Sequence, residues 1–135
     1  LVYGDTYPTR DGTCIRDYVH VSDVAHAHTL ALQYVIGHPE AEKCLIYNLG
    51  TGEGITVLEA IKAFENVSGK KLNYSIGPIR PGDVIAVYAD KALATNELGW
   101  NPKYTLEDMM STAWKWELKL QQDSIIYNNP NFANN

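Results

Sequence analysis

The stretch CLIYNLGTGEGITVLEAIKAFENVSG, residues 44–69, carries the plainest secondary-structure pattern in this chain of 135 residues. Its first six residues, 44–49, form a short apolar run bounded by glycine, which is typical of a buried strand. A glycine-rich turn follows. Thr56 and Glu59 then have the spacing of a capping box, which predicts a helix that ends near Ser68, just before a glycine. A strand followed by a helix indicates an α/β chain.

The rest of the chain continues this alternation. Residues 1–17 are rich in Gly, Pro, Asp and Thr, which indicates a loop with a short strand. Ser22 is the expected cap of a helix that ends at Gly37. The other expected elements are a β-like run over 18–21, strands over 72–76 and 84–89, a helix capped by Asp90 and closed by Gly99, and a helix from a second capping box at Thr105 to about Leu120. Four short strands cannot complete a doubly wound sheet, so we expect a small mixed α/β domain or the second half of a larger α/β protein.

Composition excludes several classes of protein. The chain is 45% hydrophobic and 20% charged, which argues against disorder. Its formal net charge of −5 argues against non-specific binding to nucleic acid or anionic lipid. Its apolar runs are too short to span a bilayer, so we expect a cytoplasmic protein. Cys14 and Cys44 lack metal-site spacing and are expected to be reduced thiols. Because Leu1 is not a methionine, we expect a piece of a longer chain.

Two of the three arginines lie in polar motifs that suit phosphate recognition. Arg16 precedes Asp17, and Arg80 begins a turn that ends at Asp83. A guanidinium binds phosphate through two parallel hydrogen bonds, and a carboxylate such as that of Asp83 suits a sugar or ribose hydroxyl. The alternative is that each arginine forms a surface ion pair with its neighbouring aspartate. The residues alone leave both interpretations open.

Other motifs favour structural roles. The glycines of Gly50–Gly54 do not have the spacing of a dinucleotide-binding loop and indicate a strand-to-helix turn. His26 and His28 diverge on a helix, so they do not form a metal site. His20 can be oriented by a hydrogen bond to Asp23, but a satisfied structural histidine is the simpler interpretation. We expect packing roles for Trp100, Trp114 and Trp116.

Four motifs taken together resemble the carboxyl-terminal part of the UDP-glucose 4-epimerase family. They are DTYPTRDGTCIRDYVHVSDVA (5–25), IYNLGTG (46–52), RPGD (80–83) and ADKALATNELGWNP (89–102). The family belongs to the extended short-chain dehydrogenases, with a Rossmann-type fold, in which an amino-terminal half holds NAD and a smaller half binds the nucleotide sugar. The resemblance implies that residues 1–120 form a UDP-sugar-binding domain. Residues 121–135 are expected to be a polar, frayed tail.

The resemblance implies substrate-binding roles for six residues. Arg16 and Arg80 would bind the UDP diphosphate, and Asp83 would bind the uridine ribose. The other three are Tyr18 beside the nucleotide, Tyr3 near the uracil, and Val87 at the edge of the sugar pocket. A small side chain at that edge would admit N-acetylated UDP-hexoses. The sequence departs from the family's usual pattern at Cys14, where glycine is common, and at Ile79, where a basic residue is common.

The chain contains no Tyr-x-x-x-Lys pair and no NAD-binding glycine loop, both of which the family's chemistry needs. The resemblance therefore implies no catalytic residue here, with NAD bound by the other half of an intact, homodimeric enzyme. Alone, the chain is expected to expose an apolar face. The alternatives are another nucleotide-sugar epimerase, dehydratase or decarboxylase, or a stand-alone UDP-binding module. A substrate with a 5-carboxylate would need an additional arginine to bind it, and Arg10 is the one arginine to which the resemblance assigns no role.

Overall fold

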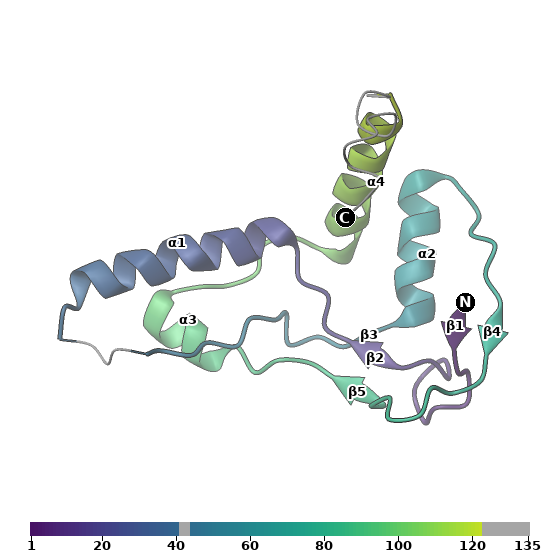
Figure 1. Cartoon of the computed structure of the whole chain (residues 1–135), viewed down its shortest axis with the longest axis horizontal. Helices are drawn as coiled ribbons and strands as arrows, with labels where there is room; N and C mark the ends of the chain where they lie inside the picture. The colour runs from purple at the N-terminus through teal and green to yellow at the C-terminus, as the bar shows by residue number, and fades with distance from the viewer. Residues whose placement is uncertain (41–43, 123–135) are drawn as a thin grey trace, which may run out of the picture.

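The computed structural model describes residues 1–40 and 44–122, and these residues form a mixed α/β structure (Figure 1). This confirms the predicted fold class. The elements in chain order are β1 (Val2–Tyr3), β2 (Ile15–Arg16), α1 (Val21–Gly37), β3 (Ile55–Thr56), α2 (Val57–Ser68), β4 (Ile76–Gly77), β5 (Ala86–Val87), α3 (Ala92–Leu98) and α4 (Leu106–Gln122). The first two residues of the predicted tail end α4, and the remainder of that tail lies outside the described residues.

The strands form two small sheets. In the first, β1 pairs in parallel with β4. In the second, β2 lies between β3 and β5, antiparallel to β3 and parallel to β5. Arg16 therefore faces Ile55 on one side and Val87 on the other. The strands predicted over 72–76 and 84–89 are each reduced to a two-residue pairing, β4 and β5.

Both predicted capping boxes and both predicted glycine helix ends are confirmed. The Thr56 hydroxyl accepts from Glu59 N (3.1 Å), while Glu59 accepts from Thr56 N (2.9 Å), so the capping box of α2 is complete. Thr105 and Asp108 form the same reciprocal pair at the start of α4. α2 and α3 end at glycines in the left-handed conformation, Gly69 and Gly99 (φ 66° and 67°).

Three predictions about elements are wrong. Residues 44–49 form no strand, because a strand needs a hydrogen-bonding partner and no strand in the described ranges pairs with them. The β-like run over 18–21 is also absent. α1 begins at Val21, and its cap is His20, whose Nδ1 accepts from Ser22 N (3.0 Å).

Asp90 is near, but not at, the cap of its helix. The N-cap of α3 is Lys91, which makes no side-chain capping bond. The Asp90 carboxylate accepts instead from the backbone N–H of Ala92 (2.9 Å). The predicted residue thus still satisfies an N–H at the helix start, one position away from the predicted geometry.

The main core lies between α1 and α3, which are neighbours in Figure 1. Trp100 is fully buried there with Ala27, Ala94 and Leu98, and its indole N–H donates to the carbonyl of Asp23 (2.9 Å). The Asp23 carboxylate accepts from the backbone N–H groups of two residues in the segment that leads to α4, Lys103 and Tyr104. The start of α1 therefore also positions the connection between α3 and α4.

The second pair of helices, α2 and α4, is joined by an edge-on contact between Phe64 and Trp114, with ring centroids 5.6 Å apart. The packing role predicted for Trp100 and Trp114 is confirmed. It is wrong for Trp116, which is 58% exposed. Trp116 lies two residues after Trp114, so it points about 200° away around the helix.

Large apolar side chains lie at the surface of α1, which agrees with the apolar face expected from the sequence. Leu32, Val35 and Ile36 are each more than half exposed. No helix among the described residues combines the length and apolar character needed to cross a membrane.

The two capping boxes provide a matched pair for measuring stability. Thr56 is fully buried and its hydroxyl also donates to Asp11 (2.5 Å), whereas Thr105 lies at the surface. We expect Thr105→Ala to lower the free energy of unfolding by about 1 kcal/mol, the usual value of a cap. Thr56→Ala should cost about 2 kcal/mol, because it also removes a buried hydrogen bond. Urea unfolding measures both, and equal costs would contradict this assignment.

Candidate nucleotide-binding site

An ion pair between Arg16 and Asp83 lies at the centre of the candidate site. Arg16 Nη2 donates to Asp83 Oδ1 (2.5 Å), and Nη1 donates to the carbonyl of Val84 (2.8 Å). Asp83 ends a turn in which its own N–H donates to the carbonyl of Arg80 (3.1 Å). Two predicted site residues that are 67 positions apart are thus in direct contact.

Arg80 and Tyr3 form a second contact at the other end of the same turn. The Arg80 guanidinium carbon lies 4.5 Å from the centre of the Tyr3 ring, a cation–π geometry. Tyr3 is held in β1, whose partner β4 leads into the turn. The turn 80–83 therefore joins both contacts into one site.

Val87 lies next to this site through the backbone. It is the register partner of Arg16 in the pairing of β2 with β5, and its side chain is 52% exposed. Five of the six predicted residues thus meet around two short strand pairings and one turn. The alternative, in which each arginine pairs with its neighbouring aspartate, is wrong: Arg16 pairs with Asp83, and Asp17 is bound elsewhere.

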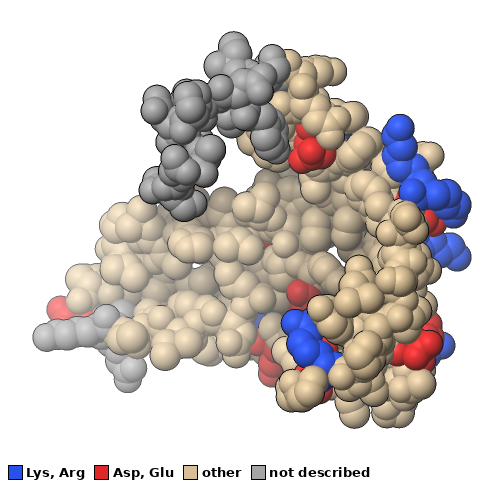
Figure 2. All heavy atoms as spheres, turned by 45° about the vertical axis from the view of Figure 1, so that its right-hand side comes forward, with Lys and Arg blue, Asp and Glu red and all other residues tan. Residues whose placement is uncertain are grey.

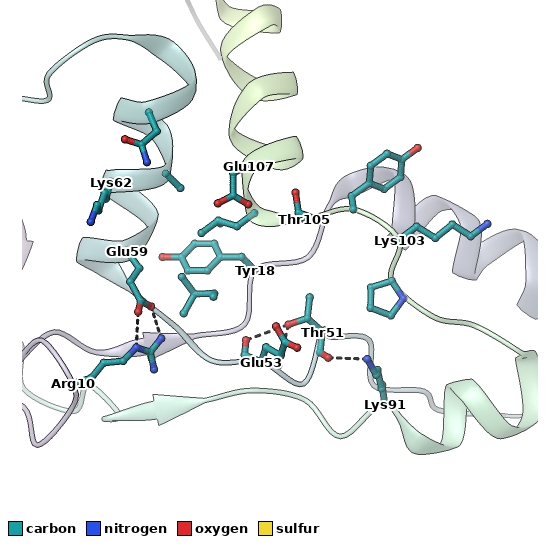
Figure 3. Close-up of a pocket in the computed structure, with 16 residues that line it drawn as sticks. Arg10, Tyr18, Thr51, Glu53, Glu59, Lys62, Lys91, Lys103, Thr105 and Glu107 are labelled. Atoms are coloured by element: carbon teal, nitrogen blue, oxygen red, sulfur yellow. Dashed lines mark hydrogen bonds and ion pairs between the residues drawn. The ribbon is translucent and has the colours of Figure 1, made fainter.

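Tyr18 is placed apart from the other five. Its ring lines an open cavity of about 780 Å³ between α2 and α4 (Figure 3), and Arg16, Arg80 and Asp83 are not among the residues that line it. The cavity also contains Arg10, Glu59 and Lys62. The charge of Arg16 acts on the Tyr18 hydroxyl, but the ion pair does not line this cavity, so the role of Tyr18 beside the nucleotide stays a prediction.

Arg10 is already engaged inside that cavity. Its guanidinium forms a bidentate ion pair with Glu59 and donates to the carbonyl of Gly54 (2.6 Å). The hydrogen bonds from Arg10 lower the pKa of Glu59 to about 2. This arginine is therefore part of the structure that holds the start of α2.

The glycine turn at 50–54 is held by the carboxylate of Asp17. Asp17 accepts from the N–H (2.9 Å) and hydroxyl (2.6 Å) of Thr51, from Gly52 N (3.3 Å) and from Ala89 N (3.0 Å). A Cβ at Gly50 would lie 2.2 Å from Asp17 Oδ2, so glycine is required there. The structural interpretation of this turn is confirmed. Burial acts to raise the pKa of Asp17, but these hydrogen bonds outweigh it and lower that pKa below its usual value.

The histidines of the described residues give no sign of a metal site, and His20 has a structural role. His20 Nε2 lies 2.9 Å from the Thr112 hydroxyl, and its ring stacks on Tyr104. This confirms a structural histidine, although not one oriented by Asp23. Among the described residues, no cluster of three or more His, Cys, Asp or Glu side chains could hold a metal ion. Cys14 is a buried free thiol and Cys44 an exposed one.

One residue of this region was missed by sequence reasoning. Tyr7 is only 7% exposed and lies close enough to Asp83, Arg16 and Arg80 for their charges to act on its hydroxyl. The only sequence signal for a role of Tyr7 was its position as an aromatic residue in a segment otherwise rich in small and polar residues.

On the face drawn in Figure 2, acidic and basic side chains lie in small mixed groups. Any anionic ligand on that face would therefore be held by local charges.

Comparison with known proteins gives a clear assignment of family. The model of the GDP-mannose 4,6 dehydratase family matches residues 1–113. The chain belongs to the GDP-mannose 4,6 dehydratase family. Within this family it is similar to UDP-glucose 4-epimerase 3 of Oryza sativa subsp. japonica, with 52% identity over 118 residues, covering 87% of this chain and 31% of the relative.

Solved structures of the family agree. A UDP-glucose 4-epimerase from Stenotrophomonas maltophila, with bound NAD and formylated UDP-arabinopyranose, is 46% identical with a TM-score of 0.84, covering 90% of this chain and 35% of that one. A UDP-Glc/GlcNAc 4-epimerase from Campylobacter jejuni is 38% identical with a TM-score of 0.76, covering 87% and 35%. The chain therefore spans about a third of the length of the relatives it matches.

Acid should destabilise this structure through its hydrogen-bonded carboxylates. The pKa values of Asp17 and Glu59 are lower in the folded chain than their usual values, so folding favours the ionised form. The contribution of Glu59 is fully present above a pH of about 4.5 and is lost as the pH falls towards about 2, and that of Asp17 is likewise lost on acidification. Thermal unfolding as a function of pH measures the effect. Arg10→Ala should weaken the acid sensitivity, and an unchanged pH profile in that variant would contradict the role given to Glu59.

Proposed function

We propose that this chain is the UDP-sugar-binding, carboxyl-terminal part of an NAD-dependent UDP-glucose 4-epimerase, an isomerase. The observation that carries the proposal is the contact between Arg16 and Asp83. It places a guanidinium that can bind a diphosphate beside a carboxylate that can accept from ribose hydroxyls. The similarity to proteins named as UDP-glucose 4-epimerases supports the same assignment.

Nucleotide binding would replace the contact between Arg16 and Asp83 by contacts of each residue with the ligand. The diphosphate of UDP offers Arg16 a new anion, while the ribose hydroxyls offer new donors to Asp83. The Asp83 side chain is 14% exposed and that of Arg16 is 31% exposed, so both groups are already partly desolvated before the ligand arrives. The polar contacts of the ligand would therefore form where solvent screening is weak.

The second contact extends the site towards the base. Arg80 would bind the diphosphate from the other side of the turn, and Tyr3 would offer its ring to the uracil. The stacking of Arg80 over that ring keeps the guanidinium close to the β1 and β4 pairing without neutralising its charge. A free positive charge there favours an anionic ligand. Tyr18 is proposed to lie beside the nucleotide from the cavity side.

The NAD cofactor is proposed to bind to a part of the enzyme outside this chain. The residues present do not fit it: the N–H groups of Thr51 and Gly52 in the glycine turn are already taken by Asp17. That carboxylate would also repel a pyrophosphate. The catalytic Tyr-x-x-x-Lys pair is assigned to the same outside part, and the homodimer expected of the intact enzyme would form through it.

The ion pair between Arg10 and Glu59 also bears on whether the substrate is a uronic acid sugar. An enzyme for a uronic acid sugar would need a cation for the 5-carboxylate of its substrate. Arg10, the spare arginine, is paired with Glu59. This contact favours a neutral sugar over a uronic acid as the substrate.

Substitution of the two site arginines tests the nucleotide site. We expect Arg16→Ala and Arg80→Ala each to weaken UDP binding by the value of one charge-assisted contact, about 1.5–3 kcal/mol or roughly 10- to 150-fold. Arg10→Ala is the matched control, because its guanidinium is bound to Glu59, and it should leave the affinity unchanged. Calorimetric titration of UDP into the natural full-length protein measures all three. Parent-like binding by both site variants would remove the proposed roles.

Substitutions in β5 test the proposed position of the sugar pocket. Val87 is small and lies beside Arg16, so we expect turnover of UDP-N-acetylglucosamine as well as UDP-glucose. Val87→Tyr should reduce the rate with the N-acetylated sugar at least about tenfold relative to the rate with UDP-glucose, since it narrows the pocket edge. Ala86→Tyr, on the opposite face of the same strand, is the control. An unchanged substrate ratio in Val87→Tyr would place the pocket elsewhere.

A further inference from the structure

The hydroxyl of Tyr7 is a buried polar group without a partner. The side chain is 7% exposed, and within the described residues its oxygen makes no hydrogen bond. Leaving a hydroxyl buried and unpaired costs about 1–3 kcal/mol, so such groups are rare in folded proteins. A group of this kind beside a candidate ligand site calls for a physical explanation.

The ring of Tyr7 is held firmly in place. Its backbone N–H donates to the carbonyl of Gly12 (2.9 Å). Gly4, at φ +78°, packs so closely that a Cβ there would lie 2.7 Å from Tyr7 Cε2 and 2.7 Å from Ile79 Cγ1. The ring is thus packed between the end of β1 and the segment that leads into Arg80. This packing keeps the hydroxyl away from water.

The hydroxyl lies among the charged groups of the site. Burial, followed by the negative charge of Asp83, raises the pKa of Tyr7, so the phenol stays protonated and can donate at neutral pH. Within the described residues, the Asp83 carboxylate accepts from the Arg16 side chain through Oδ1 alone. Its remaining lone pairs are therefore open to another donor.

Binding of a diphosphate creates a need for that donor. If the ligand draws the guanidinium of Arg16 away, Asp83 is left as a nearly buried carboxylate without its cation, which is unfavourable. We propose that Tyr7 is a positioning residue whose hydroxyl then donates to Asp83 and holds its carboxylate towards the ribose of the bound nucleotide. This inference rests on the proposed function of the site.

The variant Tyr7→Phe tests this, because it keeps the ring and removes only the hydroxyl. Since the hydroxyl has no partner in the ligand-free protein, the variant should be as stable as the parent or more stable. Its affinity for UDP should fall about tenfold, as expected for a lost hydrogen bond to a charged group. Calorimetric titration and urea unfolding of the natural full-length protein measure the two effects. A loss of folding, or an unchanged affinity, would overturn the proposal.

Tyr47→Phe is the matched control with the opposite expectation. The Tyr47 ring packs against the core of α1 and α3, and its hydroxyl donates to Glu97 (2.6 Å) at the surface, outside the candidate site. Its removal should lower stability and leave UDP affinity unchanged. The two phenylalanine variants should therefore differ in both readouts.

A double-mutant cycle with Asp83→Ala separates positioning from direct ligand contact. If Tyr7 acts through Asp83, Tyr7→Phe should cause no further loss of UDP affinity in the Asp83→Ala background. A full tenfold loss in both backgrounds would mean that the hydroxyl contacts the nucleotide itself, which overturns the proposal. Failure of the parent to bind UDP would instead overturn the proposed function together with this inference. Normal binding by the parent, with loss in Arg16→Ala but none in Tyr7→Phe, would overturn this inference alone.

Discussion

The carboxylate of Asp17 is the contact on which the arrangement of this chain depends most. The strands are two residues long, so backbone pairing alone provides little to hold the loops together. Asp17 replaces that pairing by accepting from Thr51, Gly52 and Ala89, which belong to two distant segments. Asp11 and Asp23 act similarly, at the start of α2 and before α4. Carboxylates that accept N–H and hydroxyl groups from distant segments thus substitute for longer sheets.

The candidate site follows from this arrangement. Arg16 and Asp17 are neighbours, yet their side chains bind different parts of the fold, because successive side chains of an extended strand point to opposite faces. Asp17 binds the glycine turn, whereas Arg16 reaches Asp83. A residue that fixes the fold and a residue that is proposed to bind the ligand therefore share one short segment. The ligand site is positioned by the same strand that the structural carboxylate anchors.

Features set by neighbouring residues could be predicted, and features set by distant ones could not. Both capping boxes and the glycine helix ends were predicted correctly, because each depends on residues at most four positions apart. The strand over 44–49 was wrong because pairing depends on another segment. Ser22 was a reasonable cap by residue type, but His20 lies in the capping position, and its ring is held there by Thr112 and Tyr104.

The residues alone indicate the helices, the mixed α/β class and, through four ordered motifs, the resemblance to the UDP-glucose 4-epimerase family. The sequence also places Arg16, Arg80 and Asp83 in polar motifs suited to phosphate and hydroxyl groups. Which of these residues are in contact depends on how the chain folds. Arg16 pairs with Asp83 and not with Asp17, Arg80 lies over Tyr3, and the hydroxyl of Tyr7 is buried with no partner in the described part of the chain. The physical reason is that an ion pair or an unpaired hydroxyl depends on distance and burial, which segments far apart in the sequence acquire only when the chain folds.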